Sequence, residues 1–365
     1  MTLGLVSCYN RRLASIVCGA GTGKFIGKKT FEKWIRSVAR SSNIYTGLSG
    51  PTHRRIMNSD YIGYACINMG FSERPKSQRI TTNRTMIKKT FDAKGIHYAS
   101  QLTLLNITDL LEIVKWNEQN NVKFFRMSSN MFPWASHYNI DDMPDIKEIS
   151  KKLKEVGDFA KKHNHRLTYH PGPFNKLASP KERVVQNTIT DLEIHGKVMD
   201  LMGLPRDHWA KINIHVGAAY GDKPSALKTF CENVNKLSPA VRSRLTVEND
   251  DKVSLYSTKE LYEGVHEQTG IPIVFDYHHH KLCTGGQSEQ DALELALSTW
   301  GDITPVVHYS ESAREEQNNI KIREEKHSNY IYNTINNYNN NIHVMVEAKA
   351  KELAVIKYKT EIING

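Results

Sequence analysis

The sequence predicts an α/β protein, a (β/α)8 TIM barrel that follows an N-terminal extension. Two observations predict the barrel. From Tyr61 onward, short runs rich in β-branched residues alternate eight times with longer stretches of helical periodicity. In addition, six consecutive predicted strands are each followed at once by His, Asp or Glu, and enzymes of this fold gather such residues at the carboxyl ends of their strands. We therefore expect an extension over residues 1–58 and a barrel over residues 59–365.

The extension is basic and differs in composition from the rest of the chain. Residues 1–59 hold ten Lys and Arg against a single acidic residue, Glu32, so nine of the ten net positive charges lie there. The Gly-rich segment at residues 19–24 departs from a phosphate-binding loop, because Cys18 and Phe25 occupy positions that require Gly and Ser or Thr. We expect a poorly ordered extension; a transit peptide or a DNA-gripping arm is the alternative.

Composition narrows the class of protein. A hydrophobic fraction of 39% supports a large core, and no run of apolar residues is long enough to span a membrane. Five cysteines without a C-x-x-C pair indicate an intracellular, reducing compartment, with nucleus, mitochondrion and viral replication site left open. The net charge of +10 suggests nucleic acid, but residues 60–365 carry only about one of those charges. We expect a monomer.

The predicted elements follow in order. The strands are Tyr61–Ile67, Lys123–Met127, Arg166–Tyr169, Lys211–Ile214, Arg244–Val247, Ile271–Phe275, Thr304–Val307 and Ile342–Val346. Helices are expected at Asp145–His163, Lys181–Met202, Thr258–Thr269 and Glu289–Thr299. The Asn-rich stretch at residues 333–341 is typical of a loop or a weak helix end.

The residues after the strands form the informative pattern. They are His170, His215, Glu248, Asp276, His308 and Glu347. Because strand side chains alternate between two faces, His170 shares a face with Arg166 and Thr168, Glu248 with Arg244 and Thr246, and His308 with Thr304 and Val306. The opposite face, with Leu245 and Val247, suits packing under helices. All six residues are therefore predicted to point into the barrel mouth.

Converging imidazoles and carboxylates need a cation to be stable together. His279, between His278 and His280, and His327 raise the number of candidate ligands to eight, enough for two or three ions. The mixture of nitrogen and oxygen ligands without Cys favours Mn²⁺ or Zn²⁺, with Fe less suitable, over Mg²⁺ or Ca²⁺. A multinuclear site of this kind suits hydrolysis of a phosphodiester. Sugar isomerases use a similar barrel, typically with more carboxylates and a catalytic Lys.

These residues lie in motifs that resemble the UV damage endonuclease family, in the same order, over residues 61 to 355. The motifs are Gly63–Asn68, Arg126–Trp134, His170–Phe174, His215–Gly217 with Gly221–Lys223, Glu248–Asp251, Asp276–His280, His308–Glu311 and Glu347–Glu352.

The resemblance implies a three-metal barrel, often loaded with Mn²⁺, that nicks damaged double-stranded DNA 5′ to cyclobutane dimers, 6-4 photoproducts and abasic sites. The nick would leave a 3′-hydroxyl and a 5′-phosphate. The implied ligands are His170, His215, Glu248, Asp276, His279, His308, His327 and Glu347, of which His170, Glu248 and Glu347 are expected to be catalytic. His137, which matches a histidine near the scissile phosphate, is also expected to be catalytic, and Tyr64 and Asn68 match residues that face the lesion. Arg126 and Lys223 are our candidates for contacts with the DNA backbone.

Two positions depart from the family pattern. Pro173 and Phe174 stand where the family usually has Gln followed by an aromatic residue; Phe174 can still stack on a base, but Pro173 cannot supply amide hydrogen bonds. Val306 stands where the family commonly has Lys, so we expect the site to lack a cation beside the metals. The remaining alternatives are an abasic-site endonuclease of the endonuclease IV type, a sugar isomerase, and a lesion-binding barrel that has lost catalysis.

Overall fold

The structure is a computed structural model that describes residues 58–363. The predictions for the basic extension, including the Gly-rich segment, lie outside the described residues except at Asn58. This residue caps the short 3-10 turn η1 (Ser59–Tyr61), because its side chain accepts a hydrogen bond from Asp60 N.

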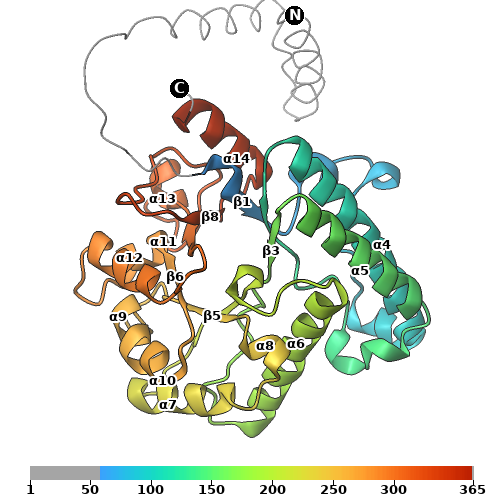
Figure 1. Ribbon diagram of the computed structural model, residues 1–365, viewed down its shortest axis with the longest axis horizontal. Coiled ribbons are helices and arrows are strands. Elements are labelled where there is room, and N and C mark those ends of the chain that lie inside the picture. The colour runs from blue at the N-terminus through green and yellow to red at the C-terminus, as the bar shows by residue number, and fades with distance from the viewer. Residues whose placement is uncertain (1–57, 364–365) are drawn as a thin grey trace, which may run out of the picture. The chain divides into compact units, whose positions relative to one another are not determined.

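All eight predicted strands are present and parallel (Figure 1). They are β1 (Ile62–Ala65), β2 (Phe124–Arg126), β3 (Arg166–Thr168), β4 (Ile212–Ile214), β5 (Leu245–Glu248), β6 (Ile273–Asp276), β7 (Val306–Tyr309) and β8 (His343–Val346). Each strand differs from its predicted bounds by one or two residues at one or both ends, and two of these differences have clear local reasons. Strand β1 ends at Ala65 because Cys66 has a left-handed backbone with φ of 70°. Strand β7 begins after Pro305, which has no backbone N–H to donate to a strand ladder.

The strands run in the order β3-β2-β1-β8-β7-β6-β5-β4, so β3 and β4 form the last joint of the barrel. A single bridge between Tyr169 and Ile212 closes this joint. Its two hydrogen bonds run from Tyr169 N to Lys211 O at 2.9 Å and from Asn213 N to Tyr169 O at 3.0 Å. The predicted (β/α)8 barrel is therefore confirmed, with one joint weaker than the others.

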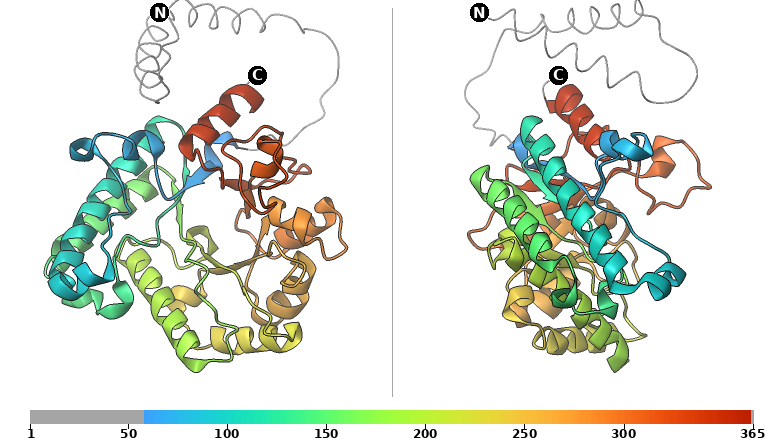
Figure 2. Two further views of the ribbon diagram at one scale, coloured as in Figure 1. Left: turned by 180° about the vertical axis from the view of Figure 1, so that it is seen from behind. Right: turned by 90° about the vertical axis from the view of Figure 1, so that its right-hand side faces the viewer.

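Helices surround the strands, as Figure 1 and the left view of Figure 2 show. The α-helices are α3 (Met69–Ser72), α4 (Lys88–Gln119, broken at Gly95), α5 (Ile146–Lys162), α6 (Glu182–Leu201), α7 (Lys223–Val234), α8 (Pro239–Arg242), α9 (Thr258–Leu261), α10 (Glu267–Thr269), α11 (Tyr277–Leu282), α12 (Glu289–Ser298), α13 (Ala313–Glu316) and α14 (Glu352–Tyr358). The π-turn η6 (Tyr262–His266) joins α9 to α10, and η7 (Lys359–Ile363) extends α14. The short 3-10 turns are η2 (Lys76–Gln78), η3 (Ala135–His137), η4 (Ile140–Asp142) and η5 (His208–Ala210). The four predicted helices are confirmed, and residues 333–341 form a loop.

No helix in the described part of the chain is both long and apolar enough to cross a membrane.

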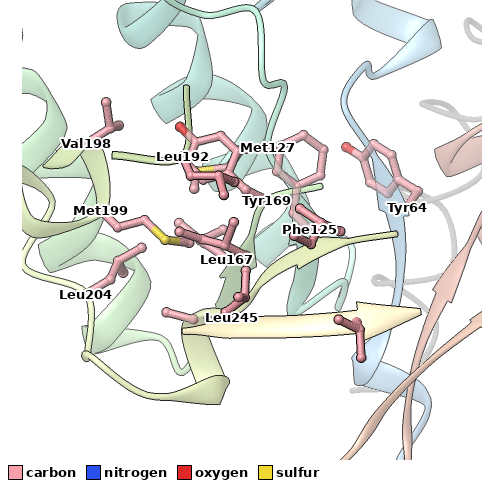
Figure 3. Close-up of a cluster of buried hydrophobic side chains, with 14 of the residues drawn as sticks. Tyr64, Phe125, Met127, Leu167, Tyr169, Leu192, Val198, Met199, Leu204 and Leu245 are labelled. Atoms are coloured by element: carbon pink, nitrogen blue, oxygen red, sulfur yellow. The ribbon is translucent and has the colours of Figure 1, made fainter. Parts of the chain in front are cut away.

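The outward-facing side chains of the strands pack under the helices. Figure 3 shows Phe125, Leu167 and Tyr169 beside Leu192 and Met199 of α6, all of them in the main core cluster. Buried apolar area of this kind contributes about 25 cal/mol per Å² to folding. The alternation that buries Leu167 and Tyr169 outside the barrel turns Thr168 and His170 toward its interior.

The interior of the barrel has two chemically different halves. An apolar half is formed by Ala65, Phe124, Val274, Val306 and Met345, which pack together in a cluster separate from the outer core. A polar half is formed by Thr168, Lys211, Asn213 and Thr246, all fully buried. In the polar half, Thr246 Oγ1 donates to Asn213 Oδ1 at 2.7 Å, and Asn213 Nδ2 donates to Glu248.

Arg166 and Arg244 were both predicted to share the inward faces of their strands. Arg166 donates to the carbonyl oxygens of Trp209 and Thr304 and lies over the Trp300 ring of the apolar cluster, which closes the floor of the barrel. For Arg244 the prediction is wrong. Its carbonyl accepts a hydrogen bond from Ile212 N at 2.8 Å, but its guanidinium donates to Pro205 O and pairs with Asp200 of α6, and these partners hold its charge outside the barrel.

Candidate metal centre

Six of the eight predicted ligands converge at the carboxyl ends of the strands. Their side chains form three overlapping groups, and within each group the candidate ligand atoms lie within 4.8 Å of one another. The groups are His170–His215–Glu248, His170–His308–Glu347 and Glu248–Asp276–His308. His170, Glu248 and His308 each belong to two groups. The arrangement is therefore one connected cluster.

Glu248 lies at the centre of this cluster. Its Oε2 is 3.0 Å from His170 Nε2 and 3.1 Å from His308 Nδ1. Burial raises the pKa of the Glu248 carboxyl, but His308 and His215 more than offset this and hold the pKa well below its usual value. Glu248 therefore carries a full negative charge at neutral pH.

Glu347 is the second anionic centre. Its Oε1 lies 3.2 Å from His308 Nδ1, and the same oxygen pairs with the Arg126 guanidinium. Burial raises the pKa of Glu347, whereas Arg126 and His308 lower it to well below its usual value. Asp276 behaves differently, because burial raises the pKa of its carboxyl.

The other two predicted ligands, His279 and His327, lie at the edge of the cluster. His279 Nδ1 donates to Asn249 O at 2.9 Å and lies 3.5 Å from Glu248 Oε1. His327 Nδ1 donates to Glu347 O, also at 2.9 Å. In both residues the backbone bond fixes the proton on Nδ1 and leaves Nε2 available, as is usual for a histidine that binds a metal.

His215 is oriented in the same way by a carboxylate. Its Nδ1 lies 3.1 Å from Asp250 Oδ1, whereas its Nε2 lies 3.8 Å from Glu248 Oε2. Burial lowers the pKa of His215, but Glu248 and Asp250 together raise it to about 10. Without a bound cation His215 is therefore protonated at neutral pH and serves as a counter-charge.

The residues present fit a divalent cation. Glu248 Oε1, Asp276 Oδ2 and His308 Nδ1 are buried and form no hydrogen bond within residues 58–363, and leaving such groups unpaired is costly. A cation would satisfy all three, and the set of imidazole nitrogens and carboxylate oxygens suits Mn²⁺ or Zn²⁺.

The two histidines that flank His279 in the sequence, His278 and His280, make contacts outside the cluster. His278 Nε2 lies 3.0 Å from Glu324 O, and the His280 ring packs 5.2 Å from the Phe275 ring. This geometry favours His279 as the ligand of the three.

Two basic side chains lie at the cluster, and one of them, Arg126, carries a positive charge, which corrects the expectation drawn from Val306. Val306 itself is fully buried in the apolar half. Arg126 pairs with Glu347, and Lys211 Nζ lies 3.3 Å from His308 Nε2. Arg126 on β2 supplies the positive charge, and Lys211 just before β4 supplies a second basic group, in place of a residue on β7. No local pattern indicates that Lys211 reaches His308, because the two residues are 97 positions apart.

The predicted DNA-contact residues differ in exposure. Phe174 is 88% exposed and Pro173 is exposed beside it, on a loop that Asn175 anchors through hydrogen bonds to Gly172 O and Asp191 Oδ2. Lys223 is partly buried and pairs with Glu260 at 2.7 Å.

Tyr64 and Asn68 are both buried. Tyr64 lies on the outer face of β1, where its hydroxyl donates to Asn117 of α4 at 2.7 Å. Asn68 caps α3 by accepting a hydrogen bond from Phe71 N. Their contact with a lesion stays a prediction, and it requires these bonds to rearrange.

His137 is the last residue of η3 and belongs to none of the three groups of candidate ligands. It is exposed, and its ring lies 5.2 Å from Trp134 and 5.7 Å from Phe91. Trp134 has a left-handed φ of 60° and is tied to Met86 O through Nε1, so the aromatic support under His137 is fixed. The role of His137 at a phosphate stays a prediction.

Sequence reasoning missed the residues that orient the ligands, namely Asp250, Asn249, Asn213 and Lys211. Asn249 and Asp250 follow Glu248 directly, and their position in that motif was the available signal. Lys211 and Asn213 share the inward face of β4 with His215, which parity could have revealed.

Comparison with known proteins shows the family to which the chain belongs. Residues 60–364 match the family model of the UV-endonuclease UvdE. The chain belongs to this family. A UV-damage endonuclease from Schizosaccharomyces pombe is 34% identical over 305 residues, which cover 81% of this chain and 49% of that protein.

A UV DNA damage endonuclease from Bacillus cereus is 30% identical over 317 residues, covering 84% of this chain and 95% of that protein. The chain thus spans about half of the fission yeast relative and nearly all of the bacterial one. Among solved structures, the crystal structure of SacUVDE matches with a TM-score of 0.70 and 30% identity, covering 83% of this chain and 98% of that one.

Proposed function

We propose that this protein is a metal-dependent DNA repair endonuclease that nicks double-stranded DNA 5′ to UV photoproducts and abasic sites. The products would carry a 3′-hydroxyl and a 5′-phosphate. One observation carries the proposal: three overlapping groups of metal-ligand residues lie at the mouth of the barrel in a chain of the UvdE family.

The proposed ligands of two or three Mn²⁺ ions are the eight predicted residues, with Zn²⁺ or another divalent ion as the alternative. Such ions supply an activated water and neutralise charge on the phosphate in phosphodiester hydrolysis. The chain's own residues prepare the site. Glu248 and Glu347 are held as anions, Asn213 orients Glu248, and Arg126 contributes a fixed positive charge beside Glu347.

DNA recognition is proposed to involve the exposed loop at Pro173 and Phe174. Removing damaged bases from the stack costs a few kcal/mol, and least where pairing is already disturbed. Phe174 would then fill the gap and stack on an adjacent base. The loop is anchored through Asn175 to Asp191 of α6, so the aromatic ring is presented from a supported backbone.

A nicking assay tests the function directly. Three matched duplexes, containing a cyclobutane dimer, an abasic site or no damage, would be incubated with protein and Mn²⁺, with and without a chelator. We expect nicks 5′ to both lesions, none in undamaged DNA, and none with chelator or with His170→Ala. Nicking of the abasic duplex alone would instead indicate an endonuclease of the endonuclease IV type. Tight lesion binding without any nick would overturn the proposed catalysis.

Phe174→Ala tests the recognition step. Loss of base stacking, worth about 1–3 kcal/mol, should weaken binding to damaged duplex by roughly 5- to 150-fold. The melting temperature should not change, because the side chain is 88% exposed. The control is Ile320→Ala, which removes an apolar side chain of similar exposure, 84%, from another loop. Equal losses in both variants would contradict a specific role for Phe174.

A further inference from the structure

Lys211 is a fully buried lysine inside the barrel, immediately before β4. Within residues 58–363 its amine forms no ion pair with a carboxylate. Burial lowers the pKa of the amine to about 7. Its Nζ approaches one side chain, His308 on the far strand β7, at 3.3 Å from Nε2. Burying an amine at such a position costs several kcal/mol, so its presence calls for a role.

The other side of the His308 ring faces the anionic centre. Nδ1 lies 3.1 Å from Glu248 Oε2 and 3.2 Å from Glu347 Oε1, and the side chain is fully buried. Each ring nitrogen therefore has its own environment: Lys211 occupies the Nε2 side, and two carboxylates occupy the Nδ1 side.

The His308 ring turns Nδ1 toward the candidate ligand atoms, whereas three neighbouring histidines turn Nδ1 away from them. In His215, His279 and His327, Nδ1 faces an oxygen outside the groups of candidate ligand atoms, from Asp250, Asn249 and the Glu347 backbone respectively. Those three residues are thus left to offer Nε2 to a cation.

We propose that Lys211 is a positioning residue that makes His308 offer Nδ1, and not Nε2, to a divalent cation held with Glu248 and Glu347. A hydrogen bond can run from an ammonium to Nε2 or from Nε2–H to an amine; both arrangements occupy Nε2 and hold the ring. The inference rests on the metal site of the proposed function.

A distinct pattern of loss follows from the grouping of ligands. His308 belongs to the groups His170–His308–Glu347 and Glu248–Asp276–His308, but not to His170–His215–Glu248. Removing Lys211 should weaken binding in the first two groups and spare the third.

Lys211→Met tests this, because methionine has an unbranched, largely apolar side chain that ends where the lysine stem ends and carries no amine. Mn²⁺ would be titrated calorimetrically into metal-free wild type and variant. We expect at least one binding step to weaken by about 10- to 100-fold, as is common when a group that orients a ligand is removed, and one step to stay unchanged. The control is Lys123→Met, which removes a lysine next to β2 that pairs with Glu118. Unchanged Mn²⁺ binding by a folded Lys211→Met protein would overturn the proposal.

A crystal structure of the Mn²⁺-loaded wild type tests the same inference without a variant. His308 Nδ1 should be the nitrogen within bonding distance of an ion; coordination through Nε2 would overturn the inference. Neither measurement uses nicking. A wild-type protein that binds Mn²⁺ through Nδ1 but leaves damaged DNA intact would overturn the proposed function and leave this inference standing.

Discussion

The two halves of the barrel interior come from the same kind of parallel strand, but they differ in chemistry and in role. In the apolar half, Phe124, Val274 and Met345 pack as an ordinary core below the site. In the polar half, Thr246 and Asn213 form a chain of hydrogen bonds that ends on Glu248. The apolar half therefore contributes packing to the stability of the barrel, whereas the polar half orients the ligand Glu248.

The largest effect is expected from Glu248→Gln, at the end of the polar chain. Its carboxylate belongs to two of the three candidate metal groups, and an amide removes its charge. Metal affinity should fall by more than about 100-fold, beyond the usual effect of a change outside the direct ligands. Calorimetric Mn²⁺ titration and the dimer-nicking assay measure this. The control is Glu112→Gln, an exposed carboxylate on α4; retained Mn²⁺ affinity in Glu248→Gln would show that Glu248 is no ligand.

Met345→Ala tests the apolar half. Its side chain is fully buried in the apolar cluster, so truncation should lower the free energy of unfolding by about 2–5 kcal/mol. Denaturant unfolding of the metal-free protein measures this loss. Below the melting temperature, Mn²⁺ affinity should match the wild type. A fall in affinity as large as that of Glu248→Gln would break the proposed division between the halves.

A smaller effect is expected from Asp250→Asn, beside the polar half. Asp250 lies 3.1 Å from Nδ1 of His215 and does not belong to any of the three candidate groups. Losing this negative charge should weaken Mn²⁺ binding by about 10- to 100-fold through His215. Asp251→Asn, at the next position, is the matched control. If both variants bind Mn²⁺ equally well, Asp250 does not orient His215.

Much of the fold could be predicted from the sequence, because the signals are local. Alternation along β3, β5 and β7 placed His170, Glu248 and His308 on one face, and a closed parallel barrel brings the strand ends together. Arg244 was misplaced because alternation says nothing about the charged partners, here Asp200 of α6, that a long side chain at the start of a strand can reach.

The contacts between distant strands could not be predicted. The approach of Lys211 to His308 depends on strand tilt and on which side chains share a level of the barrel, and neither leaves a trace in local sequence. Tyr64 shows the same limit. Alternation separates it from Ala65, but only the closed barrel shows that Ala65 faces inward and that Tyr64 bonds to Asn117 of α4.

The joint between β3 and β4 has a consequence for the barrel as a whole. One bridge closes it, and the residues just beyond it, His170 and His215, come from the two sides of that joint and share a group with Glu248. A cation held by these three side chains would stabilise the barrel at the joint that has the fewest backbone hydrogen bonds. Metal binding would then also reduce local opening of the barrel at this joint. Amide hydrogen exchange at Tyr169 and Asn213 would therefore slow on adding Mn²⁺.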